Sequence, residues 1–225
     1  MYSLKNKVTT STCDSEGRLK LYSALQMMQD CSEMWIDSEP EVKNYFLQQN
    51  MAQLLATRQV EVIRVPDYKE ELTVTTSVYG MKPMFGFRNT FIYDAQGKPC
   101  YKTWSMGAFV DKVAGKLKRV DDATIQSMKL EPQLEMNYKD RRIILPKTEG
   151  EVQEPIKVLR ADIDYNKHLN NARSASRRVT LARQELCPHG NGTVAGGFRG
   201  SRSSCGISRS SQAWRLSDSY YLQNS

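Results

Sequence analysis

Histidine is scarce in this sequence, with only two, His168 and His189, among 225 residues. Long apolar runs are absent, and because a membrane-spanning helix needs about 20 such residues, the sequence excludes a span and a membrane partner. No apolar stretch follows the segment Met1-Tyr2-Ser3-Leu4-Lys5, so we expect no secretory signal peptide. These absences leave a globular protein. Because imidazole is the side chain that titrates near neutral pH, acid–base catalysis could use only two such groups.

The cysteines show no pairing pattern. The five lie at positions 13, 31, 100, 187 and 205, and they form no C-x-x-C motif. An odd number without such spacing argues against a disulfide framework and against a zinc site. We therefore expect reduced thiols in a cytoplasmic protein.

Lysine is missing from the last quarter of the chain. Residues 1–173 hold 25 basic and 23 acidic side chains, whereas residues 174–225 hold seven arginines, no lysine and two acids. The net charge of +7 therefore divides into about +2 for the first part and +5 for the second. Because the basicity belongs to the tail, the total charge does not indicate a nucleic-acid surface.

Hydrophobic periodicity predicts an α+β fold. Apolar residues at helical spacing predict a long helix over 19–37 and a second one over 41–49, and residues 120–130 have weaker helical character. Strand patterns cover residues 7–13, 53–65, 71–79, 84–93 and 99–110. Met27 and Met28 are expected to fill the core, although flexible methionines also suit the lining of an acyl-chain site. Because long strands joined by short turns form antiparallel sheets, we expect the sheet to wrap around the long helix.

A polar decapeptide lies at residues 162–171 and reads D-x-D-x-N-x-H-x-N-N. Asp164, Asn166 and His168 are two residues apart, so in an extended segment their side chains share one face. A carboxylate, an amide and an imidazole on one face can position and deprotonate a water molecule. A polar turn before a helix is the simpler interpretation of such a segment.

The decapeptide also belongs to an internal repeat. At a constant offset of 150 residues, Val8 matches Val158, Asp14 matches Asp164 and Leu19 matches Leu169. Both copies are expected to run from a strand through a polar turn into a helix, which indicates a duplicated unit. A polar linker over 145–151 suggests a boundary near residue 148.

These residues resemble the acyl-acyl-carrier-protein thioesterases, a family with two hotdog domains in tandem. The decapeptide is similar to the signature at the start of the family's second domain, and residues 55–62 and 85–106 resemble strands of its first domain. The resemblance covers residues 3–173. It implies a first hotdog domain with its connector at residues 1–147 and the start of a second, incomplete one at 148–173.

The resemblance also implies a reaction. The family hydrolyses the thioester that links a fatty acyl chain to the phosphopantetheine arm of acyl carrier protein, without a metal or organic cofactor. By resemblance, His168 is the general base or polarises the attacking water, Asn166 orients the water or the substrate carbonyl, and Asp164 fixes the orientation and tautomer of the imidazole. Backbone N–H groups at the start of the following helix would stabilise the oxyanion, and the helix at 19–37 would line the acyl tunnel.

The resemblance ends after Arg173. Residues 174–225 contain eleven serines, six glycines and seven arginines, which is typical of a disordered tail. A shifted reading frame is the other interpretation, and it is the one we favour. The genetic code permits a test, in which the codons of a segment are read from their second base. For Gln212-Ala213-Trp214-Arg215 this shifted reading permits Lys-Pro-Gly-Asp, and the glycine at the tryptophan codon is forced. The same shift over residues 205–208 permits Val-Glu-Tyr, and both products resemble the family's second-domain pattern. His189 lies in this stretch and receives no role.

The sequence leaves several functions open. The leading hypothesis is a fatty acyl-acyl-carrier-protein thioesterase of fatty acid biosynthesis. The 225-residue chain would be inactive if its second unit lacks the scaffold of the catalytic residues. The alternatives are a non-catalytic hotdog remnant that binds acyl groups or forms a homodimer, and a thioesterase that acts on acyl-coenzyme A. Nucleic-acid binding through the tail is the least favoured.

Overall fold

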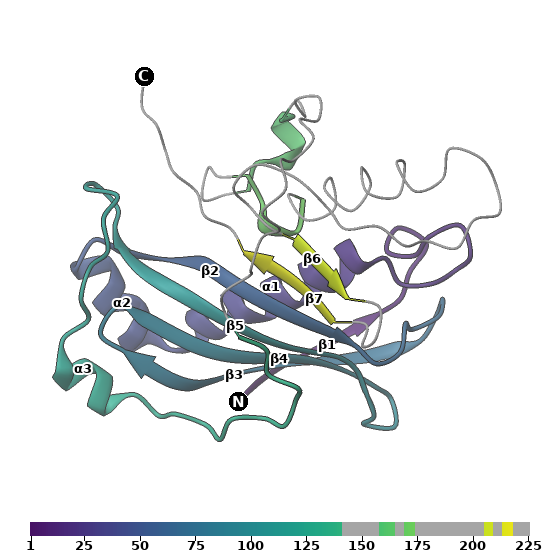
Figure 1. Cartoon of the computed structure of the whole chain (residues 1–225), viewed down its shortest axis with the longest axis horizontal. Coiled ribbons are helices and arrows are strands. Elements are labelled where there is room, and N and C mark those ends of the chain that lie inside the picture. Colours follow the sequence, from purple (N-terminus) through teal and green to yellow (C-terminus); the bar gives the residue numbers. More distant parts are fainter. Residues whose placement is uncertain (141–157, 165–168, 174–204, 209–212, 218–225) are drawn as a thin grey trace.

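The computed structural model describes residues 1–140, 158–164, 169–173, 205–208 and 213–217 (Figure 1). Its helices are α1 (Leu21–Ser38), α2 (Pro40–Gln48), α3 (Asp122–Ser127) and the short 3-10 helix η1 (Arg160–Asp162). The first three confirm the predicted helical segments, although α3 is shorter than the segment 120–130. No helix in this part of the chain is both long and apolar enough to cross a membrane.

One antiparallel sheet holds the strands in the order β1-β3-β4-β5-β2-β7-β6 (Figure 1). The strands are β1 (Tyr2–Lys7), β2 (Met51–Val62), β3 (Glu71–Lys82), β4 (Phe85–Asp94), β5 (Pro99–Asp111), β6 (Cys205–Ser208) and β7 (Ala213–Ser217). The four strands predicted between residues 53 and 110 are β2 to β5. The α+β prediction is therefore confirmed.

The first predicted strand, at 7–13, is wrong. The strand at this end is β1, which pairs with β3 and stops at Lys7. Residues 9–12 form a turn instead, in which Thr9 N donates to Thr12 Oγ1 at 2.8 Å and Thr12 N donates to Thr9 O at 3.0 Å. Threonine hydroxyls that bond to nearby backbone compete with a strand ladder, and here they override the β-branched propensity.

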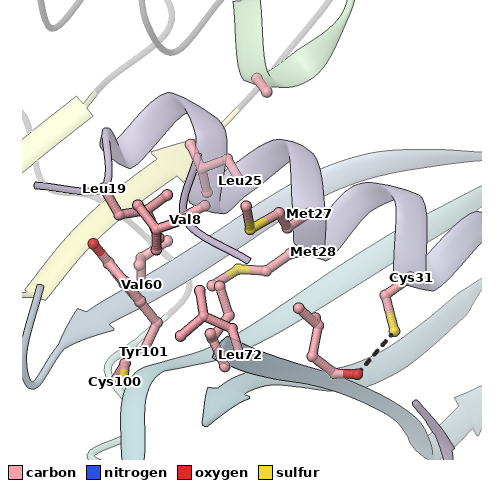
Figure 2. Packing of buried hydrophobic residues seen from close by; sticks show 14 residues of the cluster. Val8, Leu19, Leu25, Met27, Met28, Cys31, Val60, Leu72, Cys100 and Tyr101 are labelled. Carbon is pink, nitrogen blue, oxygen red and sulfur yellow. Dashed lines mark hydrogen bonds between the residues drawn. The ribbon is translucent and has the colours of Figure 1, made fainter. Parts of the chain in front are cut away.

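The core lies between α1 and the sheet. Figure 2 shows Leu25, Met27 and Met28 of α1 above Val60 and Leu72 of the sheet. Met28 is completely buried and Met27 almost so, which confirms their expected role as core residues. Burying each such side chain stabilises the fold by about 1.5–3 kcal/mol.

Further along α1 the contact with the sheet becomes polar. The Arg88 guanidinium lies over the Trp35 ring, 4.3 Å from its centroid, and Nη1 donates to Ser32 O at 3.2 Å and to Thr76 Oγ1 at 3.3 Å. Burial lowers the pKa of Arg88 to about 10, and the side chain stays cationic at neutral pH. It ties the second half of α1 to β3 and β4.

The connector at residues 131–140 crosses the opposite face of the sheet. Successive strand residues point to opposite faces, so Asn89 points away from α1 where its neighbour Arg88 points toward it. Asn89 Oδ1 accepts from Leu134 N at 3.0 Å, and Gln59 Oε1 accepts from Lys139 N at 2.8 Å. The sheet is thus covered by α1 on one face and by the connector on the other.

Two strands from the tail extend the sheet beyond β2. β7 pairs with β2 from Thr57↔Ser217 to Glu61↔Ala213, and β6 pairs with β7 (Figure 1). The remainder of residues 174–225 and the predicted boundary at 148 lie outside the described residues. The division into domains at 147 and 173 therefore stays a prediction.

Candidate active site

The first copy of the repeated segment is a turn that leads into α1. Cys13 and Leu19 form an isolated antiparallel bridge, which closes the turn. Lys20 N then donates to Thr12 O at 3.0 Å, and α1 begins at the next residue. The turn therefore sets the position of the helix that supplies the core.

A single carboxylate holds this turn together. Asp14 Oδ1 accepts from the backbone N–H groups of Glu16 and Arg18, each at 3.0 Å. Gly17, between them, has φ +78°, a conformation that glycine adopts without a steric penalty. The carboxylate of Glu16 contacts the guanidinium of Arg18, so the side chains two residues apart in the turn meet.

The second copy repeats the bridge of the first copy and the hydrogen bonds that flank it, at an offset of 150 residues. Ile163 and Leu169 form the equivalent bridge, and Asn170 N donates to Asp162 O at 2.8 Å. Leu159 N donates to Asp162 Oδ2 at 2.8 Å, as Thr9 N does to Thr12 Oγ1. Residues 171–173 are helical, as α1 is from residue 21. The repeat predicted from sequence is present, although both copies open on a turn and not on a strand.

Two polar residues of the decapeptide have structural roles. Asp162 is buried and caps the η1 turn through Leu159 N. Asn170 Oδ1 accepts from Ala172 N at 3.0 Å and from Arg173 N at 3.3 Å, as an N-cap does. The simpler interpretation, a polar turn before a helix, holds for both.

This cap bears on one expectation about the oxyanion, which stays a prediction. The sequence led us to expect that N–H groups at the start of the following helix would stabilise it. Because the N–H groups of Ala172 and Arg173 already donate to Asn170, these two are not free to bind substrate.

Of the three predicted catalytic residues, the structure places one. Asp164 is half-buried and directly follows the bridge residue Ile163. Asn166 and His168 lie outside the described residues. Ile163 and Leu169, which lie on either side of these residues in the sequence, form a β-bridge. Asp164 and Leu169 are therefore close to each other in space.

The start of the second helix packs on the start of α1. The Arg173 guanidinium lies over the Tyr22 ring at 4.7 Å from its centroid, and Ala172 belongs to the buried core. Burial raises the pKa of Tyr22, and the nearby Arg173 partly opposes this; burial also raises the pKa of Asp30. Sequence reasoning missed Tyr22, since nothing in the local pattern links residues 22 and 173.

One family description matches more than half of the chain. It is that of the acyl-ACP thioesterase N-terminal domain, and it covers residues 1–128. The chain belongs to the acyl-ACP thioesterase family. This confirms the family resemblance of the sequence. No curated protein matches the sequence.

Solved structures show the fold of these thioesterases. An acyl-ACP thioesterase from Bacteroides thetaiotaomicron superposes with a TM-score of 0.67 at 17% identity, over 96% of each chain. The 12:0-ACP thioesterase from Umbellularia californica gives 0.67 at 11% identity, over 80% of this chain and 69% of its own. A Lactobacillus plantarum protein assigned as an oleoyl thioesterase gives 0.65 at 20% identity, over 80% of this chain and 70% of its own. These likenesses confirm the hotdog fold.

Proposed function

We propose that the function encoded by this family member is the hydrolysis of fatty acyl-acyl-carrier-protein to free fatty acid and carrier, in the cytoplasm. The observation that carries the proposal is the family match over residues 1–128, followed by the polar decapeptide at the second copy of the turn. Two solved structures with this fold are named for action on acyl-ACP. Cys13, Cys31 and Cys100 are free thiols, which supports the cytoplasmic assignment.

The chemistry needs one base and one orienting group. His168 removes a proton from water while the oxygen attacks the thioester carbonyl carbon, and the carbon–sulfur bond then breaks. The proton held by His168 passes to the departing thiolate, which leaves as the free thiol of the carrier arm. The amide of Asn166 holds the water or the carbonyl in line for attack. The proposed partner is therefore the phosphopantetheine arm with its fatty acyl chain.

The proposal includes a statement about the gene. After Arg173 the composition departs from the family, and a catalytic group works only if its scaffold fixes it within about half an ångström. We therefore infer that one base is missing or added across codons 170–180, and that the 225-residue chain turns over little substrate. The nucleotide sequence there tests this: restoring one base should open a long frame with a helix followed by strands. A closed frame in both other registers would rule out the shift.

His168 is the residue to test by mutation. In the frame-restored protein, His168→Ala should reduce hydrolysis of acyl-acyl-carrier-protein by about 10²–10⁴-fold, because a general base contributes that much. The release of free thiol measures the reaction. In the 225-residue chain, His189→Ala should leave the residual turnover unchanged. Undiminished activity of the His168→Ala protein would remove this residue from the mechanism.

One observation favours a non-catalytic alternative for the chain as it stands. The first unit is complete in its helix, sheet and core, whereas the tail lacks the family's pattern. Such a unit could bind an acyl group or form a homodimer without hydrolysis. Binding of acyl-acyl-carrier-protein without thiol release, by both the written and the frame-restored chain, would favour this alternative. Faster turnover of acyl-coenzyme A than of acyl-acyl-carrier-protein would favour the other alternative, a thioesterase whose acyl carrier is coenzyme A.

A further inference from the structure

We propose that one end of the molecule docks on an anionic lipid bilayer. Its surface there carries three exposed aliphatic side chains and three exposed lysines, which are Leu47, Val113, Leu117, Lys82, Lys112 and Lys116. We call these six residues the end surface. The inference goes beyond the proposed function and does not depend on it. The sequence led us to expect no membrane partner because it has no spanning segment, but a peripheral protein binds through exposed side chains and needs none.

Three segments of the chain meet at this end. They are the end of α2, the turn between β3 and β4, and the hairpin that follows β5 (Figure 1). Lys112 N donates to Asn50 O at 3.0 Å, which joins the hairpin to the residues that follow α2. Val120 N donates to Pro83 O at 2.7 Å, which joins the segment after the hairpin to the turn. The six side chains are therefore held at the same end of the sheet.

The hairpin presents its apolar tip in a fixed form. Asp111 Oδ1 accepts from Val113 N and from Ala114 N, each at 2.9 Å. Gly115 completes the turn at φ +62°, and Asp111 N donates to Lys116 O at 2.9 Å. Val113, at the tip, is 86% exposed. Because hydrogen bonds already close this turn, little conformational freedom is lost when its side chain enters a lipid surface.

The aliphatic residues of the end surface are left out of the nearby core. Leu47 is 60% exposed and Leu117 is 52% exposed, so with Val113 they place three large aliphatic groups in water at one end. The same segments and the adjoining strands bury other apolar side chains in a small core, Met51, Phe109 and Val120. Single exposed aliphatic residues need no explanation, whereas a group of them marks a binding surface.

The charge of this end is positive because neighbouring acids are already paired. Asp111 Oδ2 accepts from Lys118 Nζ at 3.0 Å, and Asp122 Oδ1 accepts from Arg119 Nη2 at 2.8 Å. The three lysines of the end surface form no ion pair with any residue that the structure describes. Anionic lipid head groups would supply their counter-charges, and the acyl region beneath would take up the aliphatic side chains.

Acyl carrier protein is also acidic, but the end surface lies at the wrong end of α1 for it. Arg173 contacts Tyr22 at the start of α1, whereas α2 follows the end of α1. α1 has 18 residues and is about 27 Å long. A carrier docked here would therefore hold its arm at the far end of α1 from Asp164. Contact with a bilayer needs no such alignment.

The test measures co-sedimentation of the 225-residue chain with vesicles of equal parts phosphatidylcholine and phosphatidylglycerol, and with vesicles of phosphatidylcholine alone. The wild type should bind the anionic vesicles and bind the neutral ones much more weakly. Combining Lys82→Gln, Lys112→Gln and Lys116→Gln should weaken binding to the anionic vesicles by about 10²-fold, because each lysine near an anionic surface contributes a factor of about five.

The matched control removes the same charge from the opposite end of the sheet. It combines Lys20→Gln, Lys69→Gln and Lys98→Gln, and it should bind the anionic vesicles within about twofold of the wild type, because salt screens charges that far from the lipid. Equal losses in the two triple variants would indicate an effect of net charge alone. Undiminished binding by the end-surface variant would assign binding to another part of the chain, such as the arginines of residues 174–225. Either result, or no binding by the wild type, would overturn the proposal.

A further variant separates a lipid surface from other polyanions. Val113→Ser with Leu117→Ser should weaken binding to the anionic vesicles by at least about tenfold, because these side chains no longer bury aliphatic groups among the acyl chains. An unchanged affinity would mean that only the lysines act, as they would toward a nucleic acid or an acidic protein, and the lipid proposal would then be wrong. Urea midpoints equal to that of the wild type show that each variant is folded. Hydrolysis plays no part in these assays, so failure of the thioesterase proposal remains a separate result.

Discussion

At the scale of single residues, the buried side-chain amide of Gln59 connects two strands and the connector at residues 131–140. It is only 1% exposed, on the sheet face that points away from α1. Its Oε1 accepts from Trp104 Nε1 at 2.7 Å and from Lys139 N at 2.8 Å, while Nε2 donates to Asn137 O at 2.6 Å. The side chain therefore links β2 to β5 and holds the connector on the sheet.

Gln59→Leu should lower the free energy of unfolding by at least about 2 kcal/mol. The leucine has a similar volume, but it leaves an indole N–H and two backbone groups without a partner, and each unpaired buried group costs about 1–3 kcal/mol. Urea denaturation followed by tryptophan fluorescence measures the change. The exposed Gln48→Leu on α2 is the matched control and should stay within about 0.5 kcal/mol of the wild type. Equal stability of the two variants would contradict a structural role for Gln59.

At the scale of elements, α3 depends on one capping carboxylate. Asp121 Oδ1 accepts from Thr124 N at 2.8 Å, and this hydrogen bond is the main reason that the pKa of Asp121 falls from 3.8 to about 2. The adjacent Val120 is fully buried beside Phe109, so the start of α3 is anchored in a small second core. A lowered pKa in the folded state means that the cap stabilises the fold above about pH 4 and loses this effect as the pH falls toward 2.

Asp121→Asn should make the stability of the protein less dependent on pH below about pH 4. Asparagine also caps helices, so the urea midpoint at pH 6.5 should stay near the wild-type value. Between pH 4 and pH 2 the midpoint of the wild type should fall more steeply than that of the variant, because only the aspartate takes up a proton there. As a control, Asp121→Ala should be less stable already at pH 6.5. Parallel acid profiles for wild type and Asp121→Asn would show that this cap contributes nothing to the pH dependence.

At the scale of the whole molecule, the two copies of the turn meet at the start of α1. Ala172 is 2% exposed and lies in the same core cluster as Leu25 and Met28. Arg173 covers the ring of Tyr22. Residues 172 and 173 are thus joined to the start of α1 through a contact in which Ala172 is buried.

Ala172→Leu should destabilise the protein by about 1–3 kcal/mol, because added methyl groups overpack a filled core. Thermal or urea unfolding of the full chain measures this. Ala123→Leu, at an exposed helical position of α3, is the matched control and should differ from the wild type by no more than about 0.5 kcal/mol. If Ala172→Leu is as stable as the wild type, residues 169–173 do not pack against the first unit in solution.

The sequence by itself determined the elements and the kind of chemistry. Periodicity located α1, α2 and β2 to β5, because apolar spacing and turn residues act within a few positions of the chain. The offset of 150 residues identified the second turn, and the decapeptide gave the catalytic prediction for Asp164, Asn166 and His168, which stays a prediction. It misjudged residues 7–13 because side-chain hydrogen bonds between Thr9 and Thr12 outweighed β-branched propensity.

The tertiary structure decided which of the described polar residues have structural roles. Asn170 and Asp162 proved to be caps. The contact of Tyr22 with Arg173 and the place of Ala172 in the core join residues about 150 positions apart. Such contacts depend on how whole elements pack, and a local pattern carries no information about the partner that packing brings to it.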